Sequence, residues 1–363
     1  MSKIKVVIID DGVDLDTQRK LKVSCKVLKN GCVVDDIPMY QNMLTHGSKC
    51  VNIFAKYAKN YELYCLKILD VKTRRTDITS LKQGLEWCLS EKIDLVSLSL
   101  GSVQMADYLK LIPILERIKE SSMIVIAACD NDYQMTFPAS DDNIIGVKAD
   151  KFDVLAEGEY IYDSSDIFNI QIMVGSLKKI FPDFNLDNHN SYVTPYVAAL
   201  VCNMLVKGIK KNQVEEKLKI RATNKVKGYY PVFERCIKME KGICTQLGFL
   251  NPISNSQIEG LVNTFLLHGY RVLAIVDKKE DNNILLYCYD EILKRIKIDI
   301  ENERKISIFI GLIKPDLVLW NISKEKYEEK ISDLLDGIIS IEEITYNQEN
   351  FCEEIYKYIK CHY

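Results

Sequence analysis

The chain has 363 residues, of which 47% are hydrophobic and 27% charged, and its formal net charge is -3. The length exceeds one average domain, and the composition is ordinary for a globular protein. Because the charge is nearly balanced, no global field attracts nucleic acid or a membrane surface, and we expect neither as a partner. No apolar run reaches the ~18 residues that indicate a membrane span.

The number and spacing of the cysteines indicate the redox state of the compartment in which the protein works. The chain has 12 cysteines, with no C-x-x-C pair and no regular spacing. Disulfide frameworks belong to oxidising compartments, whereas cytosolic proteins keep their thiols reduced. The N-terminal apolar run is too short for a signal peptide and ends in two aspartates. We therefore expect reduced thiols and a cytoplasmic location.

Strand and helix patterns alternate along the first part of the chain. Apolar, often β-branched runs predict buried strands at 4–10, 61–69, 93–101, 123–129 and 143–149. Helical spacing predicts helices at 77–92, 106–121, 191–208 and 211–224. Asp77 or Thr79 is a candidate N-cap, Pro113 a candidate kink, and Pro195 is expected in a first turn. The alternation favours an α/β fold with a parallel sheet.

A break rich in Gly, Pro, Asn and Ser follows at 248–256, and the pattern then restarts. Helices are predicted at 256–269, 289–303 and 350–361, and strands at 270–277 and 314–322. We therefore expect two domains, 1–248 and 249–363. The smaller one looks like a Rossmann-like or degenerate P-loop-like α/β domain. It lacks the G-x-x-x-x-G-K-[ST] phosphate loop, so docking or homo-oligomer formation is expected there rather than nucleotide binding.

Three polar residues, two at the ends of predicted elements and one in a short loop motif, could together carry chemistry. Asp10 ends the first strand, His46 lies in "LTHGS", and Ser191 begins a helix. Singly, each has an ordinary reading as a turn residue, a loop residue and an N-cap. Nucleophilic serine chemistry, however, needs a hydroxyl, an imidazole that takes its proton, and a carboxylate that orients the imidazole. The order Asp, His, Ser along the chain is one in which such groups occur.

Several segments around these residues resemble motifs of the subtilisin-like serine proteases (subtilases). They are "VVIIDDGVD", "THGS", "SLSLGS", "FPAS", "DNIIGVKA" and "NSYVTPYVAAL", and the resemblance covers roughly the first 240 residues. It implies a parallel sheet with helices on both faces. It also implies that Ser191 is the nucleophile, His46 the general base and then acid, and Asp10 the orienting carboxylate. Substrate would lie extended beside Ser99, Leu100 and Gly101.

The segment "AACDND" departs from the family where an asparagine normally binds the oxyanion. The matching position is Asp130, and Cys129 replaces a glycine. A carboxylate would repel the oxyanion, and loss of such a donor typically costs ~10²–10³ in rate. Three alternatives remain open, which are an amide from Asn131, an amide from Asn190, or a protonated Asp130 that donates. Cys129 and Thr136 are expected to narrow the pocket for the side chain before the cut, favouring a small or medium residue.

Two further residues near the motifs are unusual for the family. His189 stands where a glycine is normal, and Cys50 lies four residues after His46, where it could share a helix face. A metal site needs more ligands than this pair, so no metal or other cofactor is predicted, and structural calcium stays open. Because the first strand begins near residue 4, the chain is similar to intracellular members that fold without a propeptide.

Two functions follow from the sequence. The first is a cytoplasmic serine endopeptidase of restricted specificity that acts through an acyl-enzyme on peptide or protein substrates, such as a small precursor peptide whose leader is removed. The second is a catalytically impaired relative that binds a peptide in the cleft, using Asp130 in place of the oxyanion amide.

Overall fold

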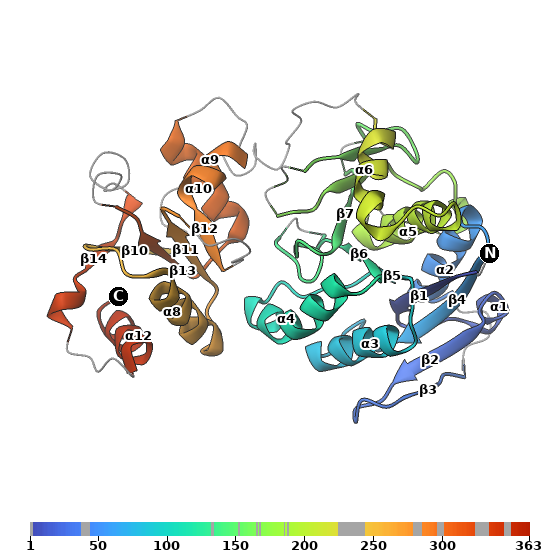
Figure 1. The fold of residues 1–363 in the computed structure, drawn as a ribbon, viewed down its shortest axis with the longest axis horizontal. Coiled ribbons are helices and arrows are strands. Elements are labelled where there is room, and N and C mark those ends of the chain that lie inside the picture. The colour runs from blue at the N-terminus through green and yellow to red at the C-terminus, as the bar shows by residue number, and fades with distance from the viewer. Residues whose placement is uncertain are drawn as a thin grey trace. The chain divides into compact units, whose positions relative to one another are not determined.

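The computed structural model of the protein (Figure 1) describes residues 3–37, 44–131, 134–151, 153–164, 166, 168–184, 186, 189–223, 244–278, 285–295, 301–323, 334–344 and 350–363. The chain divides into two compact units, Met1–Lys227 and Gly228–Tyr363. The sequence predicted two domains that meet at 248/249. Strand β10 (Thr245–Phe249) pairs within the second sheet, so the predicted boundary cuts through a strand and lies too far along the chain.

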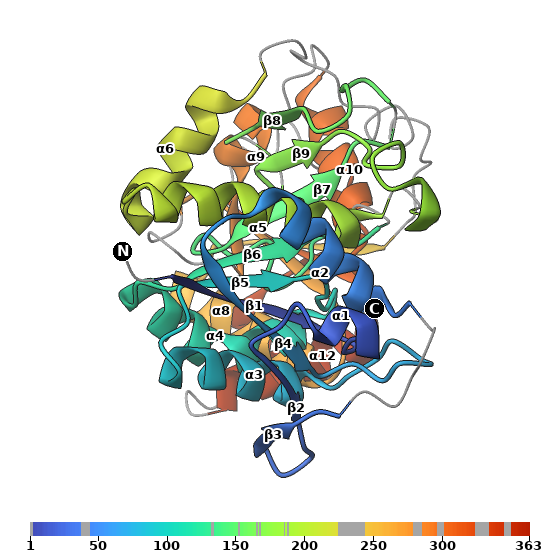
Figure 2. The same ribbon diagram turned by 90° about the vertical axis from the view of Figure 1, so that its right-hand side faces the viewer.

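Unit 1 contains a nine-stranded sheet with the order β3-β2-β4-β1-β5-β6-β7-β9-β8 (Figures 1 and 2). The seven inner strands run parallel, as predicted, while β3 and β8 at the two edges pair antiparallel with β2 and β9. The strands are β1 (Ile4–Asp10), β2 (Val23–Val27), β3 (Val33–Asp35), β4 (Tyr61–Lys67), β5 (Leu95–Leu98), β6 (Ile124–Ala128), β7 (Ile145–Ala149), β8 (Tyr160–Tyr162) and β9 (Ile172–Val174).

Helices cover both faces of this sheet. They are α1 (Leu15–Gln18), α2 (His46–Tyr57), α3 (Ile78–Ser90), α4 (Met105–Glu120), α5 (Asn190–Val206) and α6 (Lys211–Arg221), with a 3-10 turn at Pro182–Phe184. Alternate side chains of β1 pack on opposite faces of the sheet, because successive side chains of a strand point to opposite sides. Ile8 packs in one cluster with Phe54 of α2 and Val197 of α5. A β-carbon added to Gly84 of α3 would lie 4.0 Å from Ile9, on the opposite face.

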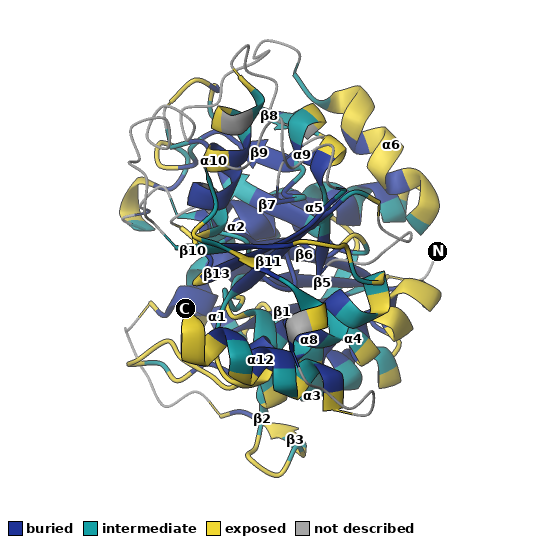
Figure 3. Cartoon of the chain, turned by 90° about the vertical axis from the view of Figure 1, so that its left-hand side faces the viewer, coloured by how far each residue is buried: buried dark blue, intermediate teal, exposed yellow. Residues whose placement is uncertain are grey.

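Helix α5 is apolar around its whole circumference, as expected for a helix enclosed by protein. Twelve of its 17 residues are buried, whereas α6 keeps an exposed outer face (Figure 3). Among the described residues, no single helix is long and apolar enough to cross a membrane. Helices α5 and α6 meet those criteria only as a pair, and their axes are bent by 118°.

Unit 2 contains a five-stranded, wholly parallel sheet with the order β12-β11-β13-β10-β14. Its remaining strands are β11 (Val272–Val276), β12 (Leu286–Cys288), β13 (Leu317–Asn321) and β14 (Gly337–Ile339). Its helices are α8 (Asn255–Leu267), α9 (Tyr289–Arg295), α10 (Asn302–Ile313) and α12 (Phe351–His362), with a 3-10 turn at Ile341–Glu343. Strand β13 separates β10 from β11. In the Rossmann order the first two strands are neighbours, so that version of the prediction is wrong.

Candidate active site

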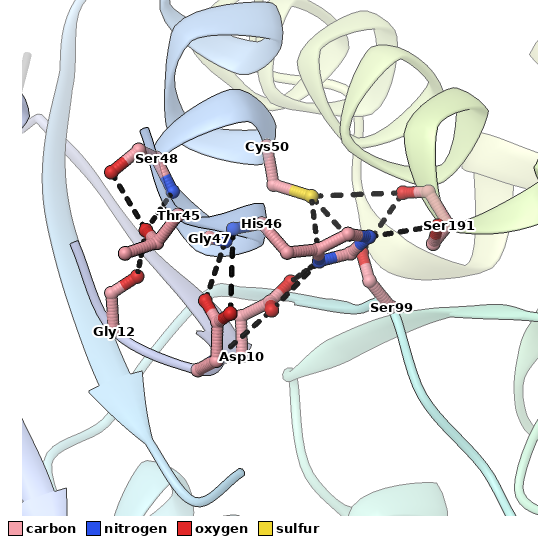
Figure 4. A network of polar contacts seen from close by, with 10 residues as sticks. Asp10, Gly12, Thr45, His46, Gly47, Ser48, Cys50, Ser99 and Ser191 are labelled. Atoms are coloured by element: carbon pink, nitrogen blue, oxygen red, sulfur yellow. Dashed lines mark hydrogen bonds and ion pairs between the residues drawn. The ribbon is translucent and has the colours of Figure 1, made fainter. Parts of the chain in front are cut away.

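The three residues singled out from the sequence meet at the carboxyl end of the parallel sheet. Asp10 is the last residue of β1, His46 the first of α2 and Ser191 the second of α5. His46 Nδ1 lies 2.8 Å and 2.9 Å from the two carboxylate oxygens of Asp10, and Nε2 lies 2.9 Å from Ser191 Oγ (Figure 4). A carboxylate only accepts, so Nδ1 carries the proton and Nε2 is free to accept the Ser191 hydroxyl. This is the geometry of a proton relay.

The first turn of α2 seats His46 tightly. The N-cap Thr45 accepts from Ser48 N at 3.0 Å, while the Asp11 carboxylate accepts from the backbone N–H groups of His46 (3.3 Å) and Gly47 (2.8 Å). Both interactions satisfy amides that a helix start leaves unpaired. A β-carbon on Gly47 would lie 2.3 Å from the carbonyl oxygen of Gly12, so only glycine fits there. The glycine after His46 therefore lets α2 approach the end of β1 closely.

Charges in this pocket shift the pKa values of two groups. Burial and, after it, the adjacent Asp10 carboxylate raise the pKa of Asp11 to about 6, against the lowering effect of the α2 amides. For His46, burial disfavours the imidazolium and lowers the pKa. The Asp10 carboxylate and then the Cys50 thiol raise it more, so that the pKa of His46 lies above its usual range. The site therefore favours the protonated imidazole that a proton transfer from Ser191 creates.

Helix α5 presents Ser191 rather than using it as a cap. The N-cap position belongs to His189, so the ordinary reading of Ser191 as an N-cap is wrong. Pro195 lies four residues after Ser191, beyond the first turn predicted for it. Because proline has no N–H, the Ser191 carbonyl loses its helical partner. That carbonyl instead accepts from Ser99 Oγ (3.0 Å) and Cys50 Sγ (3.7 Å), which fix the start of the helix beside the imidazole.

Of the two amides considered for an oxyanion, Asn190 is fully engaged elsewhere. It is completely buried, its Oδ1 accepts from Ala149 N at 2.7 Å, and its Nδ2 donates to the carbonyls of Cys129 (3.0 Å) and Asp130 (2.8 Å). Its amide thus clamps the 129–131 segment to β7. Asn190 cannot turn toward a substrate without breaking three hydrogen bonds, so its proposed role as oxyanion donor is wrong.

The side chain of Asn131, unlike that of Asn190, is exposed at the surface. Its Oδ1 accepts from the backbone N–H of Asn190 at 3.0 Å. This bond holds the amide at the start of α5, next to the residue that carries the nucleophile. Nδ2 belongs to the same amide and is a donor. Asp130 is held through its backbone, since its N–H donates to Thr136 Oγ1 at 2.9 Å.

The residues expected to bind substrate follow two neighbouring strands, and of these residues Ser99 contacts Ser191 directly, through the Ser191 carbonyl. Ser99 and Leu100, both half-buried, follow β5, and Cys129 follows the neighbouring β6. Ser102 and Phe137 exchange two backbone hydrogen bonds of 2.8 Å, which brings Thr136 against Gly101. A β-carbon on Gly101 would lie 2.6 Å from Thr136 Cγ2. The Thr136 methyl therefore fills space between the two walls.

Cys50 does share a face of α2 with His46. Its buried sulfur lies 3.8 Å from His46 Nδ1 and 3.6 Å from Ser99 Oγ. One ligand atom each from Asp10, His46 and Cys50 lies within 4.8 Å of the others, a spacing that could suit a metal ion. Both imidazole nitrogens already have hydrogen-bond partners, so the relay accounts for the cluster without one.

Sequence reasoning missed three contributors to the site. These are the amide-binding carboxylate of Asp11, the carbonyl freed by Pro195, and the ring of Tyr192, whose centroid lies 4.9 Å from that of His46. The doubled aspartate and the Ser-x-x-x-Pro spacing were the available signals for the first two. Nothing in the sequence distinguishes Tyr192 from the other apolar positions of its helix.

Part of the chain is similar in sequence to known proteins. No family model matches the chain. Subtilisin E of Bacillus subtilis (strain 168) is 25% identical over 227 residues, which cover 57% of this chain and 56% of that protein. Subtilisin of Bacillus pumilus is likewise 25% identical over 227 residues, covering 57% of this chain and 78% of that protein. The chain thus spans about half the length of the first of these relatives.

Among solved structures, a cold adapted subtilisin-like serine proteinase is 17% identical with a TM-score of 0.43, covering 62% of this chain and 85% of that one. Over 57% of its length, the chain is similar to the subtilisins, which are subtilisin-like serine proteases.

Proposed function

We propose that the protein is a serine endopeptidase that cuts peptide bonds through an acyl-enzyme. Ser191 Oγ bonds to the carbonyl carbon while its proton passes to His46 Nε2, and Asp10 holds the opposite ring nitrogen. The imidazolium then gives its proton to the leaving nitrogen as the C–N bond breaks. Water attacks the resulting ester with His46 again as base, releasing the acid and Ser191. The observation that carries this proposal is the unbroken hydrogen-bond chain from Asp10 through His46 to Ser191.

The negative charge of the tetrahedral intermediate needs donors at the start of α5. We assign this role to Asn131 Nδ2, whose amide is oriented by the Asn190 N–H, and to the backbone N–H of Ser191. Donors of this kind act in a site whose dipoles are already oriented before the charge forms. The Asp130 carboxylate would repel the oxyanion and so disfavour efficient catalysis. It therefore supports the second candidate function, that of a relative that binds peptides without cleaving them.

The substrates we propose are peptides or proteins with a restricted cleavage site, such as a small precursor whose leader is removed. Thr136 limits the space between the cleft walls, which supports selectivity. Unit 2 is a separate α/β body that could dock a precursor or a second copy of the chain. For the location we propose the cytoplasm, because the eleven cysteines among the described residues are all free thiols, as in reducing compartments. The proposed chemistry requires no cofactor.

A fluorophosphonate probe, which reacts with activated serines, tests the enzyme directly on the full-length protein. We expect labelling of the wild type and none of Ser191→Ala. Ser254→Ala is the matched control, because Ser254 also stands at a helix start but serves as the N-cap of α8. Folded wild type that is not labelled, yet binds peptides, would replace the endopeptidase with the peptide-binding relative.

A further inference from the structure

The residue after the nucleophile lies against the imidazole of the relay. Tyr192 is 5% exposed, and its ring centroid lies 4.9 Å from that of His46, with the two planes tilted by 33°. The ring of His189 is parallel to that of Tyr192 within 2°, at 6.2 Å between centroids. Lys49 Nζ lies 5.6 Å from the centroid of the Tyr192 ring. The phenol is therefore surrounded by nitrogen-bearing groups, and His46 lies nearest among the three.

The hydrogen bonds of His46 leave one motion of the imidazole open. Asp10 holds Nδ1 and Ser191 meets Nε2, so both bonds act at the edge of the ring. Two such bonds fix where the nitrogens lie but resist poorly a rotation of the ring about the line that joins them. A ring packed against the imidazole face opposes that rotation. Tyr192 supplies this contact from α5, the helix that also carries Ser191.

The charge of the imidazole changes during the proposed reaction, and an aromatic face responds to that change. A cation near the face of a tyrosine is attracted by the ring quadrupole, whereas a neutral imidazole is attracted less. Other groups also face the pair and set its background potential: Asp10 and Asp11 after β1, Lys49 and Cys50 on α2, Arg74 after β4, and His189 before α5. Of these groups, Asp10 and Cys50 contact the imidazole through its nitrogen edge.

We propose that Tyr192 is a positioning residue for His46, which holds the plane of the imidazole and stabilises the imidazolium formed when Nε2 takes the Ser191 proton. The inference rests on the proposed endopeptidase function. It adds a second residue of α5, next to Ser191, to a relay whose other two members come from β1 and α2. The proton itself moves only between Ser191 Oγ, His46 Nε2 and the leaving nitrogen, so Tyr192 takes part in no bond change.

The test is the pH dependence of the rate at which a fluorophosphonate labels Ser191 in the full-length protein. The rate should rise with pH as His46 loses its proton. In Tyr192→Leu we expect the midpoint of this rise to move to lower pH by about half a unit, from the loss of a cation–ring attraction, and the plateau to fall several-fold. Tyr192→Phe keeps the ring and should keep the midpoint. A shape defect alone would lower the plateau without moving the midpoint.

A second series of variants, with fluorinated phenylalanines at position 192, tests the proposal even if Tyr192→Leu does not fold. Phenylalanines with one, two and three ring fluorines at position 192 keep the shape but deplete the ring face of electron density. The midpoint should fall stepwise along this series. A constant midpoint in both series, with wild type labelled and Ser191→Ala unlabelled, would overturn the role of Tyr192 and leave the endopeptidase intact. Absence of wild-type labelling at every pH would instead reject the endopeptidase, and with it this inference.

Discussion

The two units use a buried asparagine in the same way, at the carboxyl ends of the parallel strands of two different sheets. In unit 1, the buried Asn190 binds Ala149 N and the carbonyls of Cys129 and Asp130. In unit 2, the buried Asn321 at the end of β13 accepts from Ile253 N at 2.8 Å and donates to the carbonyl of the same residue at 2.9 Å. Each asparagine fastens a loop that follows a strand of its own sheet.

The serines at the two helix starts make different contacts, and of these two only Ser191 reaches an imidazole. Ser254 is an N-cap, and its hydroxyl accepts from Gln257 N and donates to Gln257 Oε1. Ser191 lies two positions beyond its N-cap, so its hydroxyl is not needed by the helix and meets His46. Both serines lie at the start of a helix in an α/β unit. Their positions differ by two residues relative to the N-cap, and this difference decides whether the hydroxyl caps its own helix or contacts a neighbouring imidazole.

The sharpest test of this comparison removes the carboxylate of the relay. In Asp10→Asn, the amide cannot stabilise the imidazolium, and we expect the labelling rate and any peptide cleavage to fall by about 10⁴-fold. Because Asp10 raises the pKa of His46, the remaining activity should rise with pH at a lower midpoint than in wild type. Rate measurements across pH check both effects.

Asp11→Asn is the matched control for Asp10→Asn, since Asp11 binds backbone amides of α2 and does not touch the imidazole nitrogens. Its loss in rate should be far smaller. Equal losses for the two substitutions would mean that the aspartates act on the structure of α2 rather than through the relay.

The oxyanion assignment predicts the next largest effect. Asn131→Ala should lower the rate of cleavage by about 10²–10³-fold, with little change in KM, because the lost bond forms only with the tetrahedral intermediate. Asp130→Asn is the informative partner, since it removes the opposing carboxylate and should raise the rate. Steady-state kinetics on one peptide check both variants. Asn131→Ala with wild-type kcat would exclude its amide as the donor.

The sequence predicted the long, strongly patterned strands and helices of unit 1 well, but it missed the helix α2 (His46–Tyr57). The first strand was predicted at 4–10 and is found at Ile4–Asp10, and Asp77, rather than Thr79, caps the helix Ile78–Ser90. Short edge strands such as Val33–Asp35 were missed, because three residues carry no periodicity. The helix predicted at 289–303 in unit 2 is instead found as two, α9 and α10, with residues 296–300 outside the described part of the chain.

Within the site, motif order singled out Asp10, His46 and Ser191, which the structure brings together, although the helix His46–Tyr57 was not predicted. The oxyanion donors were harder to predict from the sequence, because a candidate amide can be judged only by the hydrogen bonds it already makes in the folded structure. Asn131 and Asn190 look equivalent in sequence, and the three hydrogen bonds that consume Asn190 depend on residues about 40 and 60 positions away. Tertiary contacts of this separation leave no local pattern.

Thr136 offers a smaller effect, on selectivity rather than rate. Its methyl fills space against Gly101, while its hydroxyl accepts from Asp130 N and donates to the Gln134 carbonyl at 2.8 Å. Thr136→Ser removes only the methyl and should improve cleavage after large side chains, relative to small ones, by about tenfold. Thr136→Val keeps the volume but loses the hydroxyl, so it should slow cleavage without changing the preference. Profiling of peptide libraries measures both, and a wild-type preference for large aromatic residues would contradict the narrowed pocket.

The smallest expected effect on activity comes from Asn321, which is the counterpart of Asn190. Asn321→Ala leaves the half-buried backbone of Ile253 unpaired and should destabilise unit 2 by about 1–3 kcal/mol, measurable by denaturant unfolding. Labelling of Ser191 should stay at the wild-type rate. Asn190→Ala makes the same chemical change in unit 1, but it frees the segment that bears Asn131, so labelling should fall along with stability. If both substitutions lowered labelling equally, the chemistry of unit 1 would depend on an intact unit 2. The two sheets would then be coupled parts of one catalyst instead of a catalyst joined to an independent body.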